Sequence, residues 1–316
     1  MISQANNGSI WSSKVSSFFV NTGSYIGNGS SQQIYMPFAP QFIIIDATGS
    51  TTNDDTIISW SGMVNPSKAS PAARTFHPLA NPTTGRITSY NIDGFTVGSD
   101  VAVNTNGQKY NYVAIGGQNG VNISTGVYTS ATAVTGRTIT CGFRPRIVFL
   151  TRTDGSTQPV VLKTESNTGD LSFRYDAALT GLTKNNIISL NATSFVLGGN
   201  AAVVAAGRAY SWCAMLPPTG ICEINTYVGD AVDNKIITTN PDFFPNWVLI
   251  KGDTNNEMVM RGENANTGDE TSVIGNSLAV ASNIIQSHGY GNFELGTSAR
   301  SNTSGSTYHY IAMKTN

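Results

Sequence analysis

The sequence predicts an all-β protein built from three tandem β-sandwich domains of jelly-roll-like form. Three observations predict this fold: one motif occurs three times without gaps, short apolar stretches alternate with Gly-, Asn- and Pro-rich turns, and no helical heptad pattern is visible. The 316 residues therefore divide into three repeats of about 100 residues, whereas length alone suggests about two domains. A unit of that size buries about two-thirds of its unfolded-chain surface, which is enough for a core.

The repeated motif joins a Phe-x-x-Gly segment to a Tyr-x-aromatic-x-Ala segment. Its copies occupy residues 95–114, 195–214 and 293–312. Because side chains two apart on a strand share a face, Tyr110 and Tyr112 point to one side and the residues between them to the other. We expect a strand, a loop and a second strand, which together form the hairpin that closes each domain.

The repeats set the domain boundaries. Residues 1–20 precede the first repeat, and their apolar side chains favour either a first strand or an attachment arm that docks into a neighbouring subunit. The β-sandwich domains then span residues 21–118, 121–216 and 221–316. The linkers between them are short, one Gly-rich and the other Pro-rich, so we expect closely spaced domains in a fixed orientation.

Each repeat carries a Phe-x-Pro step followed by an apolar strand. The prolines are Pro40, Pro145 and Pro245, and each precedes a β-branched, aliphatic or aromatic run. Proline lacks the N–H donor and suits the start of a strand. A run that is apolar on both faces predicts a central strand covered from both sides.

The middles of the repeats diverge. Repeat one has a proline-rich stretch at 63–82, which we expect to be an exposed excursion. Repeats two and three share Asn-Thr-Gly-Asp at 167–170 and 266–269, a turn signature. Two further stretches, 177–182 and 277–282, have the composition for one or two helical turns.

Composition excludes several classes of protein. Charged residues make up 12% of the chain and the formal net charge is −1, so we expect no nucleic-acid partner. The longest apolar runs are too short to span a bilayer, so we expect no membrane insertion, and the N-terminus lacks the pattern of a secretion signal. Cys141, Cys213 and Cys222 cannot all pair, which argues against a disulfide framework. Cys141 and Cys213 are predicted as small buried side chains within strands.

A search for catalytic chemistry finds no constellation. His77, His288 and His309 lie in different settings without ligand-spaced partners, and His309 is expected on the outward face of the last strand. Neither a nucleophile elbow nor a phosphate loop occurs. The carboxylates are scattered, and no pair stands out for glycoside hydrolysis. We therefore expect no catalytic residue, no metal and no cofactor.

Six residues are candidates for contact with a receptor or a partner: Trp11, Asn53, Asp54, Asp55, Trp60 and His77. The two tryptophans lie outside the gap-free motifs, and either stack on a sugar or a partner or pack in the core. The Asn-Asp-Asp triplet offers oxygen ligands for calcium, although such triplets are common in loops. The histidine lies in the proline-rich excursion.

The stretch 89–114, with the Phe-Ala-Pro step at 38–40 before it, resembles a repeat of tail proteins of tailed bacteriophages, especially aquatic ones. That repeat is similar in outline to lectin-like jelly-roll sandwiches. The resemblance covers nearly all of the chain beyond residue 20 and is closest in repeat one. Repeat two departs from it at Val204, where repeat one has Asn104, and repeat three lacks an opening glycine. The resemblance implies a virion component without catalytic residues.

The preferred hypothesis is a non-enzymatic virion structural protein, made in the host cytoplasm, that belongs to a tail fibre or appendage and contributes to assembly and host-surface recognition. One alternative is a capsid decoration protein, and a second is a glycan-binding or glycan-degrading tailspike. The expected partners are other virion proteins and a host-surface glycan. By analogy with fibre proteins, we also expect a homotrimer.

Overall fold

The computed structural model describes residues 18–48, 56–65, 70–75, 83–154, 159–175, 181–240, 243–263, 268–274 and 280–316. Within these ranges the chain forms 28 strands and one short helix, α1 (Val101–Asn104). The predicted all-β fold class is therefore confirmed. No helix in this part of the chain is long and apolar enough to cross a membrane.

Repeat one consists of two facing sheets. Its large sheet has the strand order β1 (Phe18–Ile26), β10 (Lys109–Gly117), β3 (Phe42–Ala47), β4 (Ile57–Trp60) and β7 (Arg74–Thr75). Its small sheet has the order β2 (Gln32–Tyr35), β9 (Gly94–Val97) and β8 (Ile87–Asn91). A separate ribbon pairs β5 (Val64–Asn65) with β6 (Ser70–Pro71). This ribbon lies in the stretch for which we expected an exposed, proline-rich excursion. Met63, Ala72 and Ala73 of that stretch are fully buried, so the expectation of exposure was wrong for the described part of it.

Repeats two and three have the same arrangement of strands. The large sheet of repeat two orders β11 (Ile123–Ser130), β19 (Arg208–Met215), β13 (Ile147–Arg152), β14 (Val160–Thr164), β15 (Ser172–Tyr175) and β16 (Leu182–Thr183). Its small sheet orders β12 (Arg137–Thr140), β18 (Ser194–Leu197) and β17 (Ile187–Leu190). The large sheet of repeat three orders β20 (Cys222–Val228), β28 (Thr307–Met313), β22 (Trp247–Gly252), β23 (Met258–Gly262), β24 (Thr271–Ile274) and β25 (Val280–Ala281). Its small sheet orders β21 (Lys235–Thr238), β27 (Asn292–Leu295) and β26 (Ile285–Gly289). The repetition in the sequence is thus a repetition of the fold.

The repeated motif is not a hairpin, and this expectation was wrong. Its first strand belongs to the small sheet and its second to the large sheet, so the two never pair. Their aromatic side chains instead meet edge to face across the sandwich. The ring centroids are 5.7 Å apart in the pair Phe95–Tyr112, 5.5 Å in Phe195–Trp212 and 5.2 Å in Phe293–Tyr310. Each buried ring contributes about 1.5–3 kcal/mol to the sandwich.

A second aromatic pair fixes the connection between the two sheets. In repeat one Tyr25 stacks on Tyr110 at 5.2 Å and donates a hydrogen bond to the Val103 carbonyl at 2.6 Å. Tyr110 in turn donates to the Val101 carbonyl at 2.8 Å. The equivalent stacks are Tyr128–Tyr210 at 5.0 Å and Tyr227–Tyr308 at 5.2 Å. The hydroxyls thus pair backbone carbonyls that the crossing chain would otherwise bury without partners.

Helical structure lies where the sequence indicated a loop. α1 forms within the crossing segment of repeat one, where the Asp100 carboxylate accepts a hydrogen bond from the amide of Ala102 at 2.9 Å and caps the helix. The two expected helical stretches lie partly outside the described residues. Where they are described, β16 and β25 are strands, so the helix expectation was wrong there.

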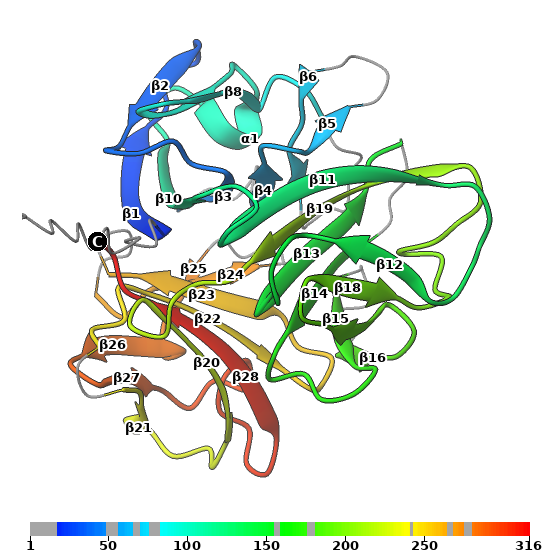
Figure 1. The fold of residues 1–316 in the computed structure, drawn as a ribbon. Coiled ribbons are helices and arrows are strands. Elements are labelled where there is room, and N and C mark those ends of the chain that lie inside the picture. The colour runs from blue at the N-terminus through cyan, green and yellow to red at the C-terminus, as the bar shows by residue number, and fades with distance from the viewer. Residues whose placement is uncertain are drawn as a thin grey trace, which may run out of the picture.

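The large sheets pack against other parts of the chain on both of their faces. In repeat one Tyr110 and Tyr112 face the core of their own sandwich, whereas Val113 and Ile115 face a central core that contains residues of all three repeats. Figure 1 shows the repeats as three lobes around this common centre. β3, β13 and β22 are therefore the central strands that we expected to be buried on both faces.

The first strand begins inside the segment that precedes the repeat. Phe18 opens β1 and pairs with Gly117, so the first-strand interpretation holds for the end of that segment, and residues 1–17 lie outside the described part. All three cysteines are free and buried. Cys213 lies within β19 as expected, whereas Cys141 follows the end of β12.

Candidate functional site: the seams between repeats and the polar grooves

Trp60 lies in the seam between repeats one and two. Its side chain is fully buried, and its indole N–H donates to the Ser211 hydroxyl at 2.7 Å. That hydroxyl donates to the Gly62 carbonyl at 2.9 Å. Trp60 is therefore a core residue, and its expected contact with an external receptor is corrected, because the ring has no exposed surface.

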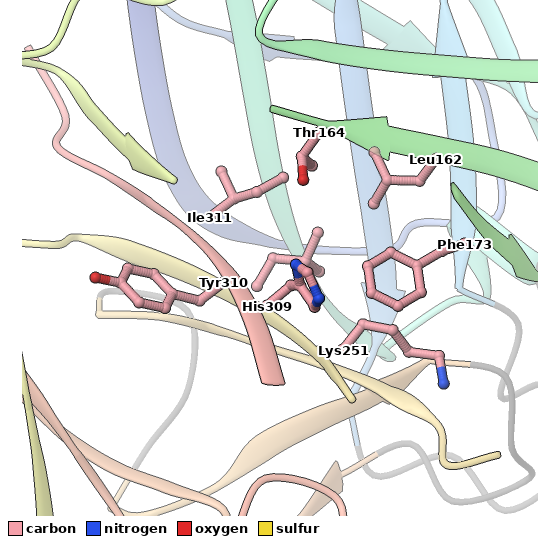
Figure 2. Close-up of a pocket in the computed structure, with 8 residues that line it drawn as sticks. Leu162, Thr164, Phe173, Lys251, His309, Tyr310 and Ile311 are labelled. Atoms are coloured by element: carbon pink, nitrogen blue, oxygen red, sulfur yellow. The ribbon is translucent and has the colours of Figure 1, made fainter. Parts of the chain in front are cut away.

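His309 holds the seam between repeats two and three. Its Nδ1 lies 2.8 Å from the Ser166 hydroxyl of repeat two, and its Nε2 lies 3.0 Å from an oxygen of Asp253. Phe173 packs edge-on against the imidazole at 5.2 Å, as Figure 2 shows. Burial lowers the pKa of His309, and the nearby Asp253 charge opposes that shift. The outward face expected for this histidine is buried, because it faces the neighbouring repeat and not solvent.

Asn111 occupies the seam between repeats three and one. It is buried, and it lines a cavity of about 10 Å³ together with Trp247 and Ser272 of repeat three. A cavity of that size has room for one water at most. The polar atoms around it make no hydrogen bond to protein, and a single water can bridge them.

The three seams are equivalent. Asn111, Ser211 and His309 occupy the same position of the motif, one residue after its first tyrosine. Each last strand contacts the neighbouring repeat: β19 meets repeat one, β28 meets repeat two and β10 meets repeat three. Head-to-tail contacts of this kind close into a ring when the rotation is right. One chain thus builds a pseudo-threefold ring.

His309 contacts both Ser166 and Asp253, and these are the three residue types of a serine hydrolase triad. The cavity beside His309 has a volume of about 10 Å³, which leaves no space for an acyl group. The Ser166 hydroxyl is also 2.8 Å from the Thr164 hydroxyl. Because serine and asparagine take the place of His309 in the other seams, we interpret the cluster as a structural contact.

Repeat two carries a polar groove of about 350 Å³ between its two sheets. Lys163 lies at its floor and donates to the carbonyls of Asn167, Gly169 and Leu171 at 3.3, 2.9 and 2.6 Å. The buried cation therefore holds the Asn-Thr-Gly-Asp turn. Burial lowers the pKa of Lys163 to about 8, and Asp170 opposes the shift. Leu190 of the small sheet lines the opposite wall.

Repeat three carries the equivalent groove, with a volume of about 280 Å³. Arg261 takes the place of Lys163 and donates to the Ile285 carbonyl at 2.8 Å, the Glu270 carbonyl at 3.2 Å and the Gly268 carbonyl. His288 takes the place of Leu190 on the small sheet.

Repeat one fills the same position with its own side chain. Ser59 pairs with the third residue after Pro40, as Lys163 and Arg261 pair with the third residue after the equivalent prolines, so Ser59 stands where the other repeats have their cation. Tyr90 stands where they have Leu190 and His288. The Tyr90 hydroxyl lies 2.6 Å from the Ser59 hydroxyl, and burial raises the pKa of Tyr90. The repeats thus share one interior site, which an aromatic ring occupies in repeat one.

The sequence did not reveal these grooves, and most of its own candidates cannot be placed. Trp11, Asn53, Asp54, Asp55 and His77 lie outside the described residues. The groove residues come from two sheets that meet only in the fold. In the sequence, the one indication of the grooves was the shared Asn-Thr-Gly-Asp turn, which in both repeats follows a single basic residue within an apolar strand.

No group of three or more His, Cys, Asp or Glu side chains in the described ranges could hold a metal ion. In comparisons with known proteins, no family model and no curated protein matches the sequence.

Proposed function

We propose that this chain is a non-enzymatic structural protein of a tailed-phage virion, a component of a tail fibre or appendage that contributes to assembly and host-surface recognition. The observation that carries the proposal is the closed ring. The three sandwiches share one central core, so the described part of the chain is a single body. The resemblance of its motif to phage tail repeats supplies the virion context.

The ring suits an assembly role for a physical reason. A homotrimer presents one surface three times, and a partner with threefold symmetry can engage all three copies. This chain keeps that geometry, yet each repeat carries its own loop sequences. It can therefore face a symmetric neighbour with its framework and make different contacts with each repeat.

A capsid decoration protein is the second candidate. The same ring also suits it, because a compact pseudo-threefold body matches a threefold position on a shell. The two candidates place the protein on different parts of the particle.

Immunogold electron microscopy of purified particles separates these candidates, with antibodies raised against the purified chain. Gold on the tail supports the tail component, and gold on the shell alone supports the decoration protein. Mass spectrometry of the same particles supplies the control. Absence of the chain from intact particles would overturn both.

The expected homotrimer is tested by light scattering of the purified chain. A mass of about three chains supports it, whereas a mass of 33.4 kDa refutes it and leaves the ring within one chain as the source of threefold geometry.

A further inference from the structure

Of the three equivalent seam residues, only His309 changes its charge near neutral pH. Asn111 and Ser211 take its place in the other seams, and amide and hydroxyl side chains do not titrate in this range. The unperturbed pKa of histidine is about 6.5. The side chain of His309 is only 8% exposed, so the seam between repeats two and three must accommodate any proton that it takes up.

The neighbours of His309 determine which ring nitrogen carries the proton. The side-chain nitrogen of Asn167 lies 3.2 Å from His309 Nδ1, and its side-chain oxygen accepts from the Thr164 amide at 2.8 Å. Because that hydrogen bond orients the carboxamide, the Asn167 nitrogen donates and Nδ1 accepts. The proton therefore sits on Nε2, which lies 3.0 Å from Asp253. The neutral ring thus binds repeat two through Nδ1 and its own repeat through Nε2.

Protonation of His309 removes an acceptor that repeat two uses. A proton on Nδ1 places two N–H donors 3.2 Å apart, one on the ring and one on Asn167. The Ser166 hydroxyl can turn to accept from the new N–H, because the Thr164 hydroxyl at 2.8 Å then accepts from it. Asn167 cannot turn in the same way, because Thr164 holds its side-chain oxygen. The contact between the repeats therefore loses a hydrogen bond and gains a repulsion between two donors.

The charges of repeat three favour a protonated ring only in part. Asp253 favours it, but the side chain of Asp253 is 37% exposed, so water and salt weaken the effect of its charge. Lys251 opposes it, because Lys251 is the cross-strand partner of His309 on β22 and lines the same small cavity. Thr226, the partner of His309 on β20, carries no charge. Burial accordingly lowers the pKa of His309 in spite of Asp253.

The charged groups of repeat two near the ring do not favour its protonation either. Lys163 is a further cation, and its ammonium lies 3.3 Å from the Asn167 carbonyl. Glu165 is close in the chain, but Arg146 neutralises its carboxylate at 2.6 Å. A protonated His309 therefore has cations near it in both repeats, and its one favourable partner is a carboxylate that is partly exposed.

Apolar side chains lie directly beside this polar contact. The small cavity next to His309 is lined by Leu162 and Phe173 of repeat two and by Leu249 and Ile311 of repeat three (Figure 2). All four belong to the central core that the three repeats share. Separation of the two repeats at His309 therefore exposes part of the central core to water.

We propose that the seam between repeats two and three is a pH-sensitive contact, which opens when His309 is protonated, while the seams at Asn111 and Ser211 stay closed between pH 7 and pH 5. An opened seam exposes the histidine, which then takes up a proton at about pH 6.5, whereas the closed seam disfavours the proton. The closed seam is therefore fully stable above about pH 6.5 and loses stability as the pH falls below it. This response does not depend on where the protein lies in a particle.

The test is hydrogen exchange of the full chain at pH 7 and pH 5, measured by mass spectrometry and corrected for the effect of pH on intrinsic exchange. Peptides from β14 and β28 report on this seam, and peptides from β4 and β19 report on the seam at Trp60. The ratio of the two cancels any effect of acid on the whole chain, such as protonation of His288. We expect the ratio to rise at least fivefold from pH 7 to pH 5. A pKa of about 6.5 in the open seam sets a limit of about 25-fold.

Three variants separate protonation from packing. His309→Asn, which copies repeat one, should make the ratio independent of pH, and His309→Ser, which copies repeat two, should do the same if the first variant does not fold. Asp253→Asn keeps an acceptor for Nε2–H and removes the charge that favours the protonated ring. Its ratio should therefore rise more than that of the wild type.

Three outcomes overturn the proposal. The first is a wild-type ratio that stays constant between pH 7 and pH 5, which includes equal acceleration of exchange at both seams. The second is a rise that persists in a folded His309→Asn or His309→Ser chain, because another group would then be responsible. The third is a smaller rise in Asp253→Asn than in the wild type, because the carboxylate would then act against the protonated ring.

Discussion

Truncation of Trp60 tests whether the three repeats are one folding unit. The side chain is fully buried in the seam between repeats one and two, and it packs in the central core. Replacement of a buried tryptophan by alanine costs about 3–5 kcal/mol. An exposed receptor-binding tryptophan would cost about 0.5 kcal/mol or less. The two interpretations of this residue therefore differ by several kcal/mol.

The hydrogen bond can be separated from the packing. Ser211→Ala keeps the ring in place and removes the acceptor of its N–H at 2.7 Å, so the indole N–H is left buried and unpaired. That change costs about 1–3 kcal/mol. Trp60→Ala should therefore be more destabilising than Ser211→Ala.

The assay is urea denaturation followed by tryptophan fluorescence and by far-UV circular dichroism. If the central core is shared, both probes give one transition in the wild type, and Trp60→Ala shifts that whole transition. Separate transitions, of which the substitution moves only one, would refute the shared core. A loss below about 0.5 kcal/mol would refute the buried position of Trp60.

Three further predictions concern repeated positions. Tyr25→Phe, Tyr128→Phe and Tyr227→Phe each lose a hydrogen bond to a backbone carbonyl, so each should lower the free energy of unfolding by about 1 kcal/mol; unequal losses in thermal melts would contradict the equivalence of the repeats. Lys163→Met leaves three carbonyls unpaired and should cost about 3 kcal/mol of stability, whereas Lys163→Arg, which copies Arg261, should retain most of the stability. Equal melting temperatures for the two variants would contradict the proposed role of the positive charge in pairing these carbonyls. Because burial holds the pKa of His288 at about 3 in the folded chain against about 6.5 in the unfolded chain, the unfolded state takes up the proton first, and stability falls as pH drops from about 6.5 toward 3. Between pH 7 and pH 5 this loss is about 2 kcal/mol, and urea melts of His288→Leu should lack it; an unchanged pH dependence would argue against a buried neutral ring.

The sequence predicted the elements well and their partners poorly. Phe95, Phe195 and Phe293 are fully buried in equivalent positions, as the gap-free motif indicated. The motif was nevertheless misread as a hairpin. The sequence shows that two strands follow each other along the chain, but it does not show whether they pair within one sheet.

The seams could not be predicted for a related reason. Asn111, Ser211 and His309 are polar, and a polar residue between two buried aromatic residues indicates a solvent-facing position. Their faces are buried only because a neighbouring repeat covers them. That cover depends on how the three large sheets pack together, and no local pattern of residues records it.

The ring closure carries a prediction about chain connectivity. Val20 and Asn316 are joined at the seam between repeats three and one, since the Val20 amide donates to the Asn316 side chain at 3.0 Å. Backbone hydrogen bonds join Leu216 to Asn122 and Lys314 to Ile221, so the chain enters and leaves every repeat at the same end. If the contacts between repeats define the fold, the place where the chain is cut matters little.

A circular permutant tests this directly. The new chain begins at Thr219, runs to Asn316 and continues from Met1 to Pro218, so that residues 1–17 become the linker. Because closing a loop of that length costs little more than closing a shorter one, we expect a folded chain with one cooperative transition and a free energy of unfolding within about 2 kcal/mol of the wild type. The matched control opens the chain between Val113 and Ala114, inside β10, and should not fold, because that cut divides a strand that pairs on both sides. Failure of the first permutant to fold would show that the order of the repeats along the chain, and not the closed ring, determines the fold.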